Sequence, residues 1–387
     1  MTNRLDLAHR FPGLADGWAR FDGPAGTQPV DVAIDATADF MRSGQVANSH
    51  GAFAAAEACD QLMERARATV ARLLGADPGG LAFGPSSTAM IMRVASAVSR
   101  RLGPGDEIVC TQLDHDANVM PWVIAADDAG ATVRMAELDT TTGRLPVEHV
   151  TAQLSDRTQW VAVTGASNAL GTIPEVGAIV EAAHEVGARV LVDGVHRTPH
   201  RDIDVAALGC DAYVTSPYKW YGPHAGVLWM RPDLLDDLAV AKVRPADDHG
   251  PGRIEWGTPA YESIAGIMAA ADFLLDVGMA SIEAHERAGF ARLLDGLLAL
   301  DAVTVHGPTD LDNRAPTLAF TVHGHAPDAV ARRLAAAEVA VWDGHYYAIE
   351  AMTALGLIDR GGAVRAGMAV YLGDDDVDRL LEVVAAL

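Results

Sequence analysis

The most informative stretch of the sequence runs from Asp211 to Gly226 and reads DAYVTSPYKWYGPHAG. An apolar run, 212–215, is followed by small polar residues, by the single lysine Lys219, and by a turn that contains glycine and proline. This pattern predicts a buried strand with a lysine just beyond its carboxyl end. Burial lowers the pKa of a lysine amine and makes the amine nucleophilic, as a Schiff base with an aldehyde requires. A lone lysine is more often a solvated surface residue, so the neighbouring strand ends must decide between these interpretations.

Two other predicted strand ends favour the nucleophilic lysine. Asp193 follows the apolar run 189–192, and a carboxylate at this edge suits the pyridine nitrogen of pyridoxal 5'-phosphate (PLP), which it keeps protonated. Ser86, Ser87 and Thr88 follow a predicted strand at 81–83 and begin a helix. Hydroxyls and free N–H groups at a helix start can bind a phosphate. The three strand ends together predict a PLP site.

The surrounding pattern indicates an α/β fold, because short β-branched runs alternate with longer amphipathic stretches. Strands separated by helices predict a mainly parallel sheet that is covered on both faces. The seven expected strands are 81–83, 107–111, 132–137, 160–164, 189–192, 212–215 and 226–230. The expected helices are 52–74, 88–101, 117–128 and 176–186.

The pattern changes after about residue 260, where helices are expected at 262–277, 280–300, 327–337 and 374–387. Strands are expected there at 316–322 and 364–371. This predicts a smaller α+β domain formed by 1–14 and 261–387, beside a large PLP-binding domain formed by 15–260.

Composition limits the classes of partner. The 387 residues carry a formal net charge of −23, which disfavours nucleic acids and anionic membrane surfaces. The three cysteines form no CxxC pair, and His196 and His200 have Pro199 between them and no evident third ligand, so no metal site is expected. The sequence shows neither a signal-peptide pattern nor an apolar run of about 18 residues, which favours a cytoplasmic protein.

Several segments resemble, in their order along the chain, those of the class V aminotransferase family of fold-type-I PLP-dependent enzymes, and particularly its cysteine desulfurase-like branch. These segments are FDGPAGT at 21–27, LDHDANVMPW at 113–122, SNALG at 167–171, DGVH at 193–196, SPYK at 216–219, EWGTP at 255–259 and VRAG at 364–367. The resemblance covers nearly the whole chain.

The resemblance implies roles for residues of the PLP site. Lys219 would form the Schiff base, Asp193 would face the pyridine nitrogen and His115 would stack on the ring. Asn168 would reach cofactor and substrate, and Ser216 would bind the phosphate.

Further roles depend on positions where this sequence departs from the family or relies on a second subunit. His196 replaces a glutamine at the phenolic oxygen, and Tyr218 replaces a histidine that contacts the phosphate. Arg365 would clamp the substrate carboxylate. Thr258 would contact the phosphate of the neighbouring subunit, so the resemblance implies a homodimer with shared active sites.

A third departure bears on the reaction. Desulfurases carry a nucleophilic cysteine in a loop whose counterpart here reads DGHYYA at 343–348, with Tyr347 at the position of the cysteine. A persulfide-forming desulfurase is therefore not expected. Tyr346 and Tyr347 are interpreted either as core aromatics or as residues of a substrate pocket.

The leading hypothesis is a PLP enzyme acting on an amino acid, with Lys219, His115 and Asp193 as catalytic residues. A carbon–sulfur β-lyase for a cysteine S-conjugate in specialised metabolism is favoured. An aminotransferase, a decarboxylation coupled to oxidative deamination, and an epimerase remain alternatives. A catalytically silent scaffold with the PLP fold is the hypothesis from another class.

Overall fold

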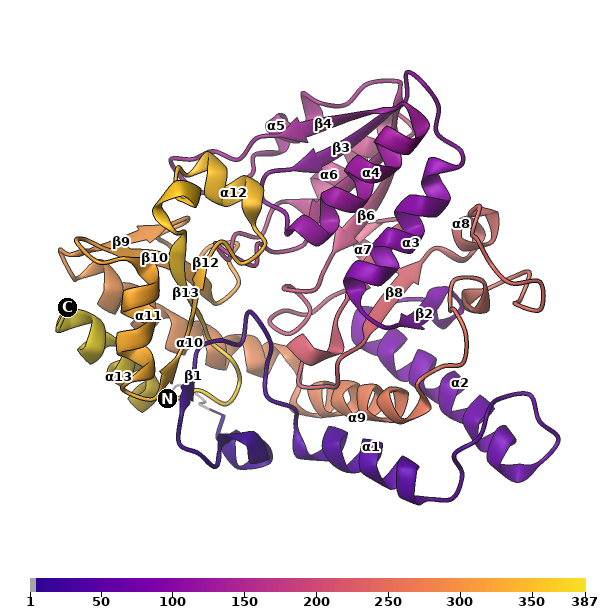
Figure 1. Ribbon diagram of the computed structural model, residues 1–387, viewed down its shortest axis with the longest axis horizontal. Coiled ribbons are helices and arrows are strands. Elements are labelled where there is room, and N and C mark those ends of the chain that lie inside the picture. The colour runs from indigo at the N-terminus through magenta and orange to yellow at the C-terminus, as the bar shows by residue number, and fades with distance from the viewer. Residues whose placement is uncertain (1–4) are drawn as a thin grey trace.

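A computed structural model of the chain describes residues 5–387, so positions 1–4 of the predicted small domain lie outside the described residues. Its main feature is a seven-stranded sheet (Figure 1). The strand order is β2 (Leu81–Gly84), β8 (Gly226–Met230), β7 (Ala212–Thr215), β6 (Arg189–Asp193), β5 (Thr158–Thr164), β3 (Glu107–Thr111) and β4 (Thr132–Ala136). The predicted α/β fold is confirmed, and the predicted strand ends agree with the structure to within two residues.

Strand β8 is the exception to parallel pairing. It is antiparallel to both of its neighbours, whereas β4, β3, β5, β6 and β7 are parallel. The ten residues between β7 and β8 include only a short 3₁₀ turn, Pro217–Lys219, and no crossover helix. A chain without such a crossover returns in the opposite direction beside the strand it has left.

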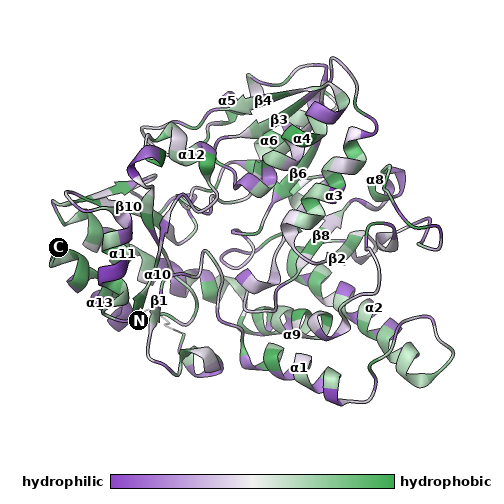
Figure 2. Ribbon diagram, in the orientation of Figure 1, coloured by the Kyte–Doolittle hydropathy of each residue, from purple (hydrophilic) through white to green (hydrophobic). Residues whose placement is uncertain are grey.

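Helices cover both faces of this sheet. They are α2 (Ala54–Leu74), α3 (Ser87–Ser99), α4 (Met120–Ala129), α5 (Val147–Thr151), α6 (Val176–Glu185), α7 (Val205–Leu208) and α8 (Pro232–Asp237). In β6, Val190 and Val192 pack into one hydrophobic core while Leu191 packs into the other. This explains why the strand is apolar at successive positions. Figure 2 shows the apolar colour on α4, α6 and the strands between them.

A second, four-stranded antiparallel sheet has the order β12 (Trp342–Gly344), β13 (Ala363–Gly367), β10 (Thr317–Val322) and β9 (Val303–His306). The same part of the sequence also contains four helices, α10 (Met279–Leu298), α11 (Pro327–Ala335), α12 (Ile349–Ala354) and α13 (Asp374–Ala385). The strand predicted at 364–371 ends at Gly367, because Gly367 N–H donates to Phe21 O outside the sheet.

The N-terminal segment joins the two parts. Strand β1 (Ala19–Arg20) pairs in parallel with β11 (Val339–Ala340). Helix α1 (Asp31–Arg42), which the sequence analysis did not predict, packs on α9 (Tyr261–Val277) along the lower edge of Figure 1. The division into domains at residues 14 and 260 stays a prediction.

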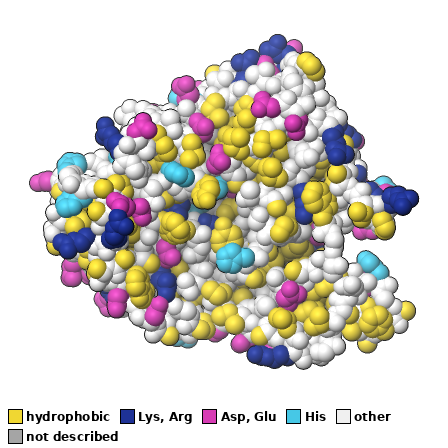
Figure 3. Space-filling model, in the orientation of Figure 1, with side chains coloured by type: hydrophobic (Ala, Val, Ile, Leu, Met, Phe, Trp, Pro, Cys, Tyr) yellow, Lys and Arg dark blue, Asp and Glu magenta, His cyan; other side chains and the backbone are white. Residues whose placement is uncertain are grey.

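Among the described residues, no single helix has the length and apolar character to cross a membrane. Helices α9 and α10 pass that test only as a pair, bent by 78°, and only by length and composition. Acidic side chains are scattered over the face shown in Figure 3 and do not gather in one patch.

Candidate active site

Lys219 and Asp193 lie at the same edge of the seven-stranded sheet. Asp193 is the last residue of β6, which pairs with β7, and Lys219 ends the 3₁₀ turn that follows β7. Burial, together with the charge of Arg365, lowers the pKa of Lys219 to about 7, although Asp193 acts in the opposite direction. Burial raises the pKa of Asp193 to about 6, against the effects of the Val195 N–H group and of Lys219. The predicted buried lysine with a nearby carboxylate is thus present.

The segment 21–27 also reaches this lysine. The Lys219 amine donates a hydrogen bond to the carbonyl oxygen of Pro24. Thr27 fixes the turn that carries the lysine, because its hydroxyl donates to Tyr218 O at 3.0 Å and accepts from Tyr221 N–H at 3.0 Å. The N-terminal loop therefore holds the lysine turn from outside the sheet.

Three serines form a hydroxyl cluster at the start of α3. Ser216 Oγ, just after β7, donates to Ser87 Oγ at 2.8 Å, and Ser86 Oγ accepts from Ala89 N–H at 3.1 Å as the N-cap. Strand β8 passes so close that a Cβ at Gly226 would lie 2.3 Å from the carbonyl carbon of Ser86. The predicted phosphate-binding groups Ser86, Ser87 and Ser216 are thus brought together, whereas Thr88 is exposed.

His115 precedes a 3₁₀ turn, Asp116–Asn118, at the carboxyl side of β3. Its Nδ1 accepts from Ala117 N–H at 3.0 Å, so a neutral ring carries its proton on Nε2. Burial, with smaller effects from the charges of Lys219 and Arg365, lowers the pKa of His115 to about 4. The ring of Tyr347 stacks on His115, with 5.5 Å between ring centroids and 20° between planes.

Arg365 and Asn168 form a buried polar pair with unsatisfied atoms. Arg365 Nη1 donates to Asn168 O at 2.9 Å, and Asn168 Nδ2 donates to Tyr346 O at 2.9 Å. Arg365 Nε and Asn168 Oδ1 are buried without a hydrogen-bond partner in the described part of the chain. Burial lowers the pKa of Arg365 to about 10. Buried polar groups without partners are rare, and such atoms can bind a ligand or a water molecule.

Tyr346 and Tyr347 lie on a strained loop. Both have left-handed backbone angles, with φ of 52° and 57°, which non-glycine residues seldom adopt. Tyr346 is buried and its ring lies 4.6 Å from the guanidinium carbon of Arg365, whereas the Tyr347 side chain is exposed. The carbonyl oxygen of Tyr347 accepts from Asp116 N–H at 2.7 Å, so the loop is held over His115.

His196 and Tyr218 complete the cluster. His196 is buried, and its Nε2 lies 2.9 Å from Thr317 Oγ1 on β10. The Tyr218 ring stacks on His224, with 4.8 Å between centroids, and burial raises the pKa of the Tyr218 phenol.

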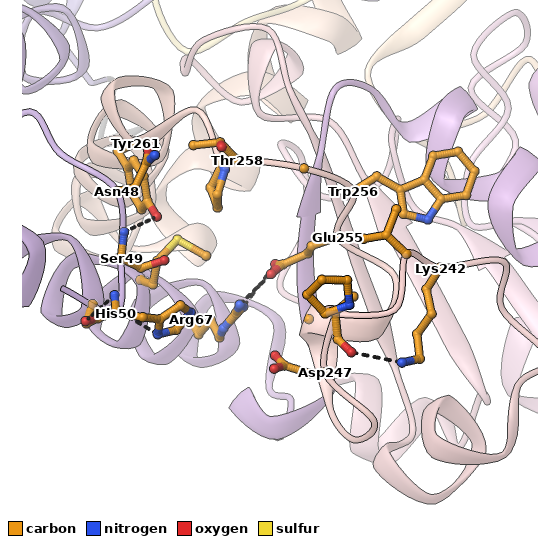
Figure 4. Close-up of a pocket in the computed structure, with 18 of the residues that line it drawn as sticks. Asn48, Ser49, His50, Arg67, Lys242, Asp247, Glu255, Trp256, Thr258 and Tyr261 are labelled. Carbon is orange, nitrogen blue, oxygen red and sulfur yellow. Dashed lines mark hydrogen bonds and ion pairs between the residues drawn. The ribbon is translucent and has the colours of Figure 1, made fainter.

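Thr258 lies apart from these residues. It is exposed and lines a cavity of about 1220 Å³ between the segments 48–67 and 241–261. The lining includes the ion pair of Arg67 with Glu255 at 2.7 Å (Figure 4). Figure 3 shows this cavity as a notch at the right of the molecule. Within the described residues, no other predicted site residue lines it.

Comparisons with known proteins identify the family. The family model for aminotransferase class-V matches residues 20–380. The chain belongs to the class V aminotransferase family. It is 33% identical over 397 residues to the uncharacterized protein MT3887 of Mycobacterium tuberculosis, with 97% of each chain covered. It is 33% identical to a cysteine desulfurase of Yersinia pestis, with 93% of this chain and 91% of the other covered.

Solved structures of class V enzymes share the fold. The cysteine desulfurase CsdA of Escherichia coli superimposes with a TM-score of 0.89 at 27% identity, covering 98% of this chain and 97% of the other. A cysteine desulfurase from Thermococcus onnurineus gives a TM-score of 0.93 at 26% identity, covering 100% and 99%. The expected fold and family are confirmed.

PLP is the cofactor of class V enzymes, and the site fits it. A buried amine stands beside a buried carboxylate, and serine hydroxyls surround the first turn of α3. Within the described residues, the unsatisfied Arg365 Nε is a donor for an anionic ligand, and the unsatisfied Asn168 Oδ1 is an acceptor for a donor group of the ligand. Among the described residues, no group of three or more His, Cys, Asp or Glu side chains could hold a metal ion.

Sequence reasoning missed two carboxylates beside the site. Asp114 is buried and accepts from Thr111 Oγ1 at 2.5 Å and from Asn118 Nδ2 at 2.8 Å, while burial raises its pKa to about 8. Asp22 has a buried Oδ1 without a partner in the described chain, and burial raises its pKa. Both lie in segments that the sequence analysis quoted, but nothing in the pattern distinguishes them from turn residues.

Proposed function

We propose that this class V enzyme cleaves the carbon–sulfur bond of a cysteine S-conjugate. In this β-elimination the Cα proton and the thiolate leave, and water then releases pyruvate and ammonium, so the products are a thiol, pyruvate and ammonium. The observation that carries the proposal is the environment of the thiols. Cys59, Cys110 and Cys210 are all buried, and burial raises the pKa of Cys210 to about 12. A desulfurase needs an accessible thiol to accept sulfur.

The loop at 343–348 supports the same proposal. Tyr347 stands where the resemblance expects the sulfur-accepting cysteine, and its exposed ring stacks on His115. An aromatic side chain at the site mouth suits a thioether with a bulky sulfur substituent. A tyrosine at this position can bind such a substituent but cannot take over its sulfur.

Arg365 is the proposed anchor of the substrate carboxylate. Its planar guanidinium is suited to a two-point contact with a carboxylate, and Nε is without a partner in the described chain. The face of the guanidinium packs on Tyr346, which fixes its plane. Fixing the carboxylate chooses which bond at Cα is broken.

Lys219 is the proposed base for the Cα proton. When bound through Lys219, PLP supplies an electron sink that stabilises negative charge at Cα. With a pKa of about 7, the free Lys219 amine accepts a proton on Nζ near neutral pH. His115 is the proposed proton relay, because its ring is neutral at that pH and its Nε2 carries a proton. Asp193 would hold the pyridine nitrogen in its protonated form.

We also infer that the active form is a homodimer with shared sites. Thr258 and Trp256 are exposed in the cavity of 1220 Å³, as a residue that serves a neighbouring subunit would be. Light scattering on the PLP-loaded protein should give twice the chain mass. A PLP-loaded monomer would refute this inference. The cytoplasmic location and the place in specialised metabolism stay predictions.

The test is incubation of the PLP-loaded protein with a panel of S-substituted cysteines, with separate assays for thiol and pyruvate. Equal amounts of both products are expected, and the variant K219A is the control. Alanine formed from free cysteine would identify a desulfurase, and a keto-acid-dependent exchange would identify an aminotransferase. Release of carbon dioxide, or an inverted amino acid, would identify the decarboxylating enzyme or the epimerase. Any of these results without thiol and pyruvate would overturn the proposal.

A further inference from the structure

A row of three buried titratable side chains, His196, His200 and Glu286, runs from the PLP site toward α10 and takes no part in the proposed reaction. His196 and His200 are four residues apart in the segment after β6, and their rings meet edge to face with 5.1 Å between centroids. His200 Nδ1 lies 2.8 Å from Glu286 Oε2 on α10. Glu286 is 1% exposed. The row therefore leads from the site into the contact between α10 and the segment that follows β6.

The second oxygen of Glu286 is also satisfied. The Tyr221 hydroxyl donates to Glu286 Oε1 at 3.3 Å and accepts from Val370 N–H at 3.1 Å. His200 Nδ1 and Glu286 Oε2 share one proton across their contact, since one of the two atoms must donate to the other. A buried carboxylate is tolerated when it is paired and hydrogen-bonded in this way.

His196 is the residue of this row that lies nearest the site. Burial lowers its pKa well below 6.5, and the charges of His200, Lys219 and Arg365 lower it further. His196 is therefore a neutral ring at neutral pH. A neutral imidazole can replace the neutral glutamine amide of the family without adding a charge beside the cofactor.

We propose that Glu286 holds a proton on His200, and that the His200–Glu286 pair thereby keeps His196 uncharged and fixed in one orientation beside PLP. His200 and Glu286 are then positioning residues that act through His196. This role at the cofactor site does not depend on which reaction the enzyme catalyses.

Other charged groups surround the pair. On the site side these are Lys219, Arg365 and Asp193. Behind His200, a small cavity of about 20 Å³ is lined by Arg201, Glu283, Arg287 and Arg314. Arg201 is paired with Glu283 at 2.9 Å and Arg287 lies 3.9 Å from Asp312, so two of these cations have their own carboxylates.

Glu283 provides a matched control. It lies one turn before Glu286 on α10 and binds Arg201, the residue directly after His200. The variant E283Q removes a carboxylate from the same helix and the same contact, but leaves the His200 pair intact.

The first measurement is ¹⁵N NMR of ring nitrogens in the apo-protein at pH 6, with the His196 signal assigned by its loss in H196Q. On further acidification we expect His196 to bind its proton at a lower pH in the wild type and in E283Q than in E286Q, because burial acts in all three proteins but the charge of His200 acts only in the first two. A charged His196 in the wild type at pH 6, or an unchanged titration of His196 in E286Q, would overturn the proposal.

The second measurement is the PLP dissociation constant of the apo-protein in a double-mutant cycle. E286Q should weaken PLP binding by about three- to tenfold and E283Q by less than about twofold. In the H196Q background, E286Q should have no further effect, because the amide cannot be protonated. An equal loss in that background would show that Glu286 is only structural. If E286Q does not fold, H200Q replaces it in the same cycle with the same expectations.

Discussion

Two carboxylates of the seven-stranded sheet are both buried, but their pKa values are shifted in opposite directions. Glu107 starts β3, is 3% exposed, and binds Arg134, Arg157 and Ser155 Oγ, each at 2.7 Å. These partners lower the pKa of Glu107 to about 2. Asp193 ends β6, is 6% exposed, and burial raises its pKa to about 6.

The difference separates a structural end of the sheet from a functional one. Glu107 has its hydrogen-bond partners within the chain, so it stabilises the fold. Asp193 has a single backbone donor, and Lys219 offsets only part of the effect of burial, so in the free protein its charge costs stability that a bound cation would recover. Arg365 Nε and Asn168 Oδ1, which are buried without a partner in the described chain, lie near the second end, whereas at the first end the oxygens of Glu107 are satisfied and Arg134 Nε is not.

Removal of Lys219 should have the largest effect at the functional end. K219A should abolish the visible absorption band of covalently held PLP and lower kcat by at least about a thousandfold, because both the Schiff-base amine and the proposed base are lost. Absorbance spectra and turnover measure both effects. A persistent band in K219A would mean that another amine holds the cofactor.

Exchange of single carboxylates tests the comparison directly. D193N should lower kcat/KM by about a hundredfold or more, since the amide cannot keep a pyridine nitrogen protonated. E107Q should leave kcat/KM within about twofold. Steady-state kinetics at saturating PLP measure both. Similar losses in the two variants would remove the proposed division between the ends.

The substrate anchor should give a smaller and more selective effect. R365K should raise KM for the amino acid by about ten- to a hundredfold with a lesser change in kcat, because lysine cannot form the two-point contact. A series of substrates with the carboxylate converted to an amide should lose the difference between R365K and wild type. If it persists for the amides, Arg365 does not bind the carboxylate.

Stability should change in opposite directions at the two ends. At pH 7 the apo-variant E107Q should be less stable by about 2 kcal/mol, since it leaves two arginines without their carboxylate. Apo D193N should be more stable by about 1–2 kcal/mol, because a neutral amide keeps the acceptor for Val195 N–H without a buried charge. Urea unfolding of the apo-proteins measures both, and destabilisation by D193N would contradict the comparison.

The stability of the apo-protein should depend on pH with the same signs, and this is the smallest of the expected effects. A lowered carboxyl pKa stabilises the fold above the unfolded value, so the contribution of Glu107 is lost as pH falls from 4.5 toward 2. A raised pKa has the reverse effect, so Asp193 destabilises the apo-protein as pH rises from 3.8 through 6. Urea unfolding at a series of pH values measures this dependence. The free energy of unfolding of the wild type should approach that of E107Q at low pH and that of D193N below pH 4.

Much of the sheet and the lysine turn could be predicted from sequence, because both depend on local patterns. The run 212–215 and the following Lys219 are read from neighbouring residues, and the structure agrees. The reversal of β8 could not be predicted, since pairing direction depends on the path of the connection. The exposure of Thr88 beside Ser86 and Ser87 could not be predicted either, because the outward face of the first helical turn is not evident from residue type, and its role at the phosphate stays a prediction.

Contacts between distant parts of the chain could not be predicted. Glu286, which the sequence analysis did not name, meets His200 across 86 residues, and the contact of the predicted Asn168 with Tyr346 spans 178. No spacing rule connects such positions. The left-handed angles of Tyr346 and Tyr347 were also unforeseen, because tyrosine carries no signal for that conformation.

The pairing of β1 with β11 has a consequence for synthesis. Residues 19–20 need residues 339–340 as their partner, and the adjoining loop at 21–27 holds the lysine turn. During translation the first strand leaves the ribosome some three hundred residues before its partner, so β1 stays unpaired until the chain is almost finished. A nascent chain can thus complete its seven-stranded sheet, and join the loop to the lysine turn through Thr27, before the strand that precedes this loop has a partner.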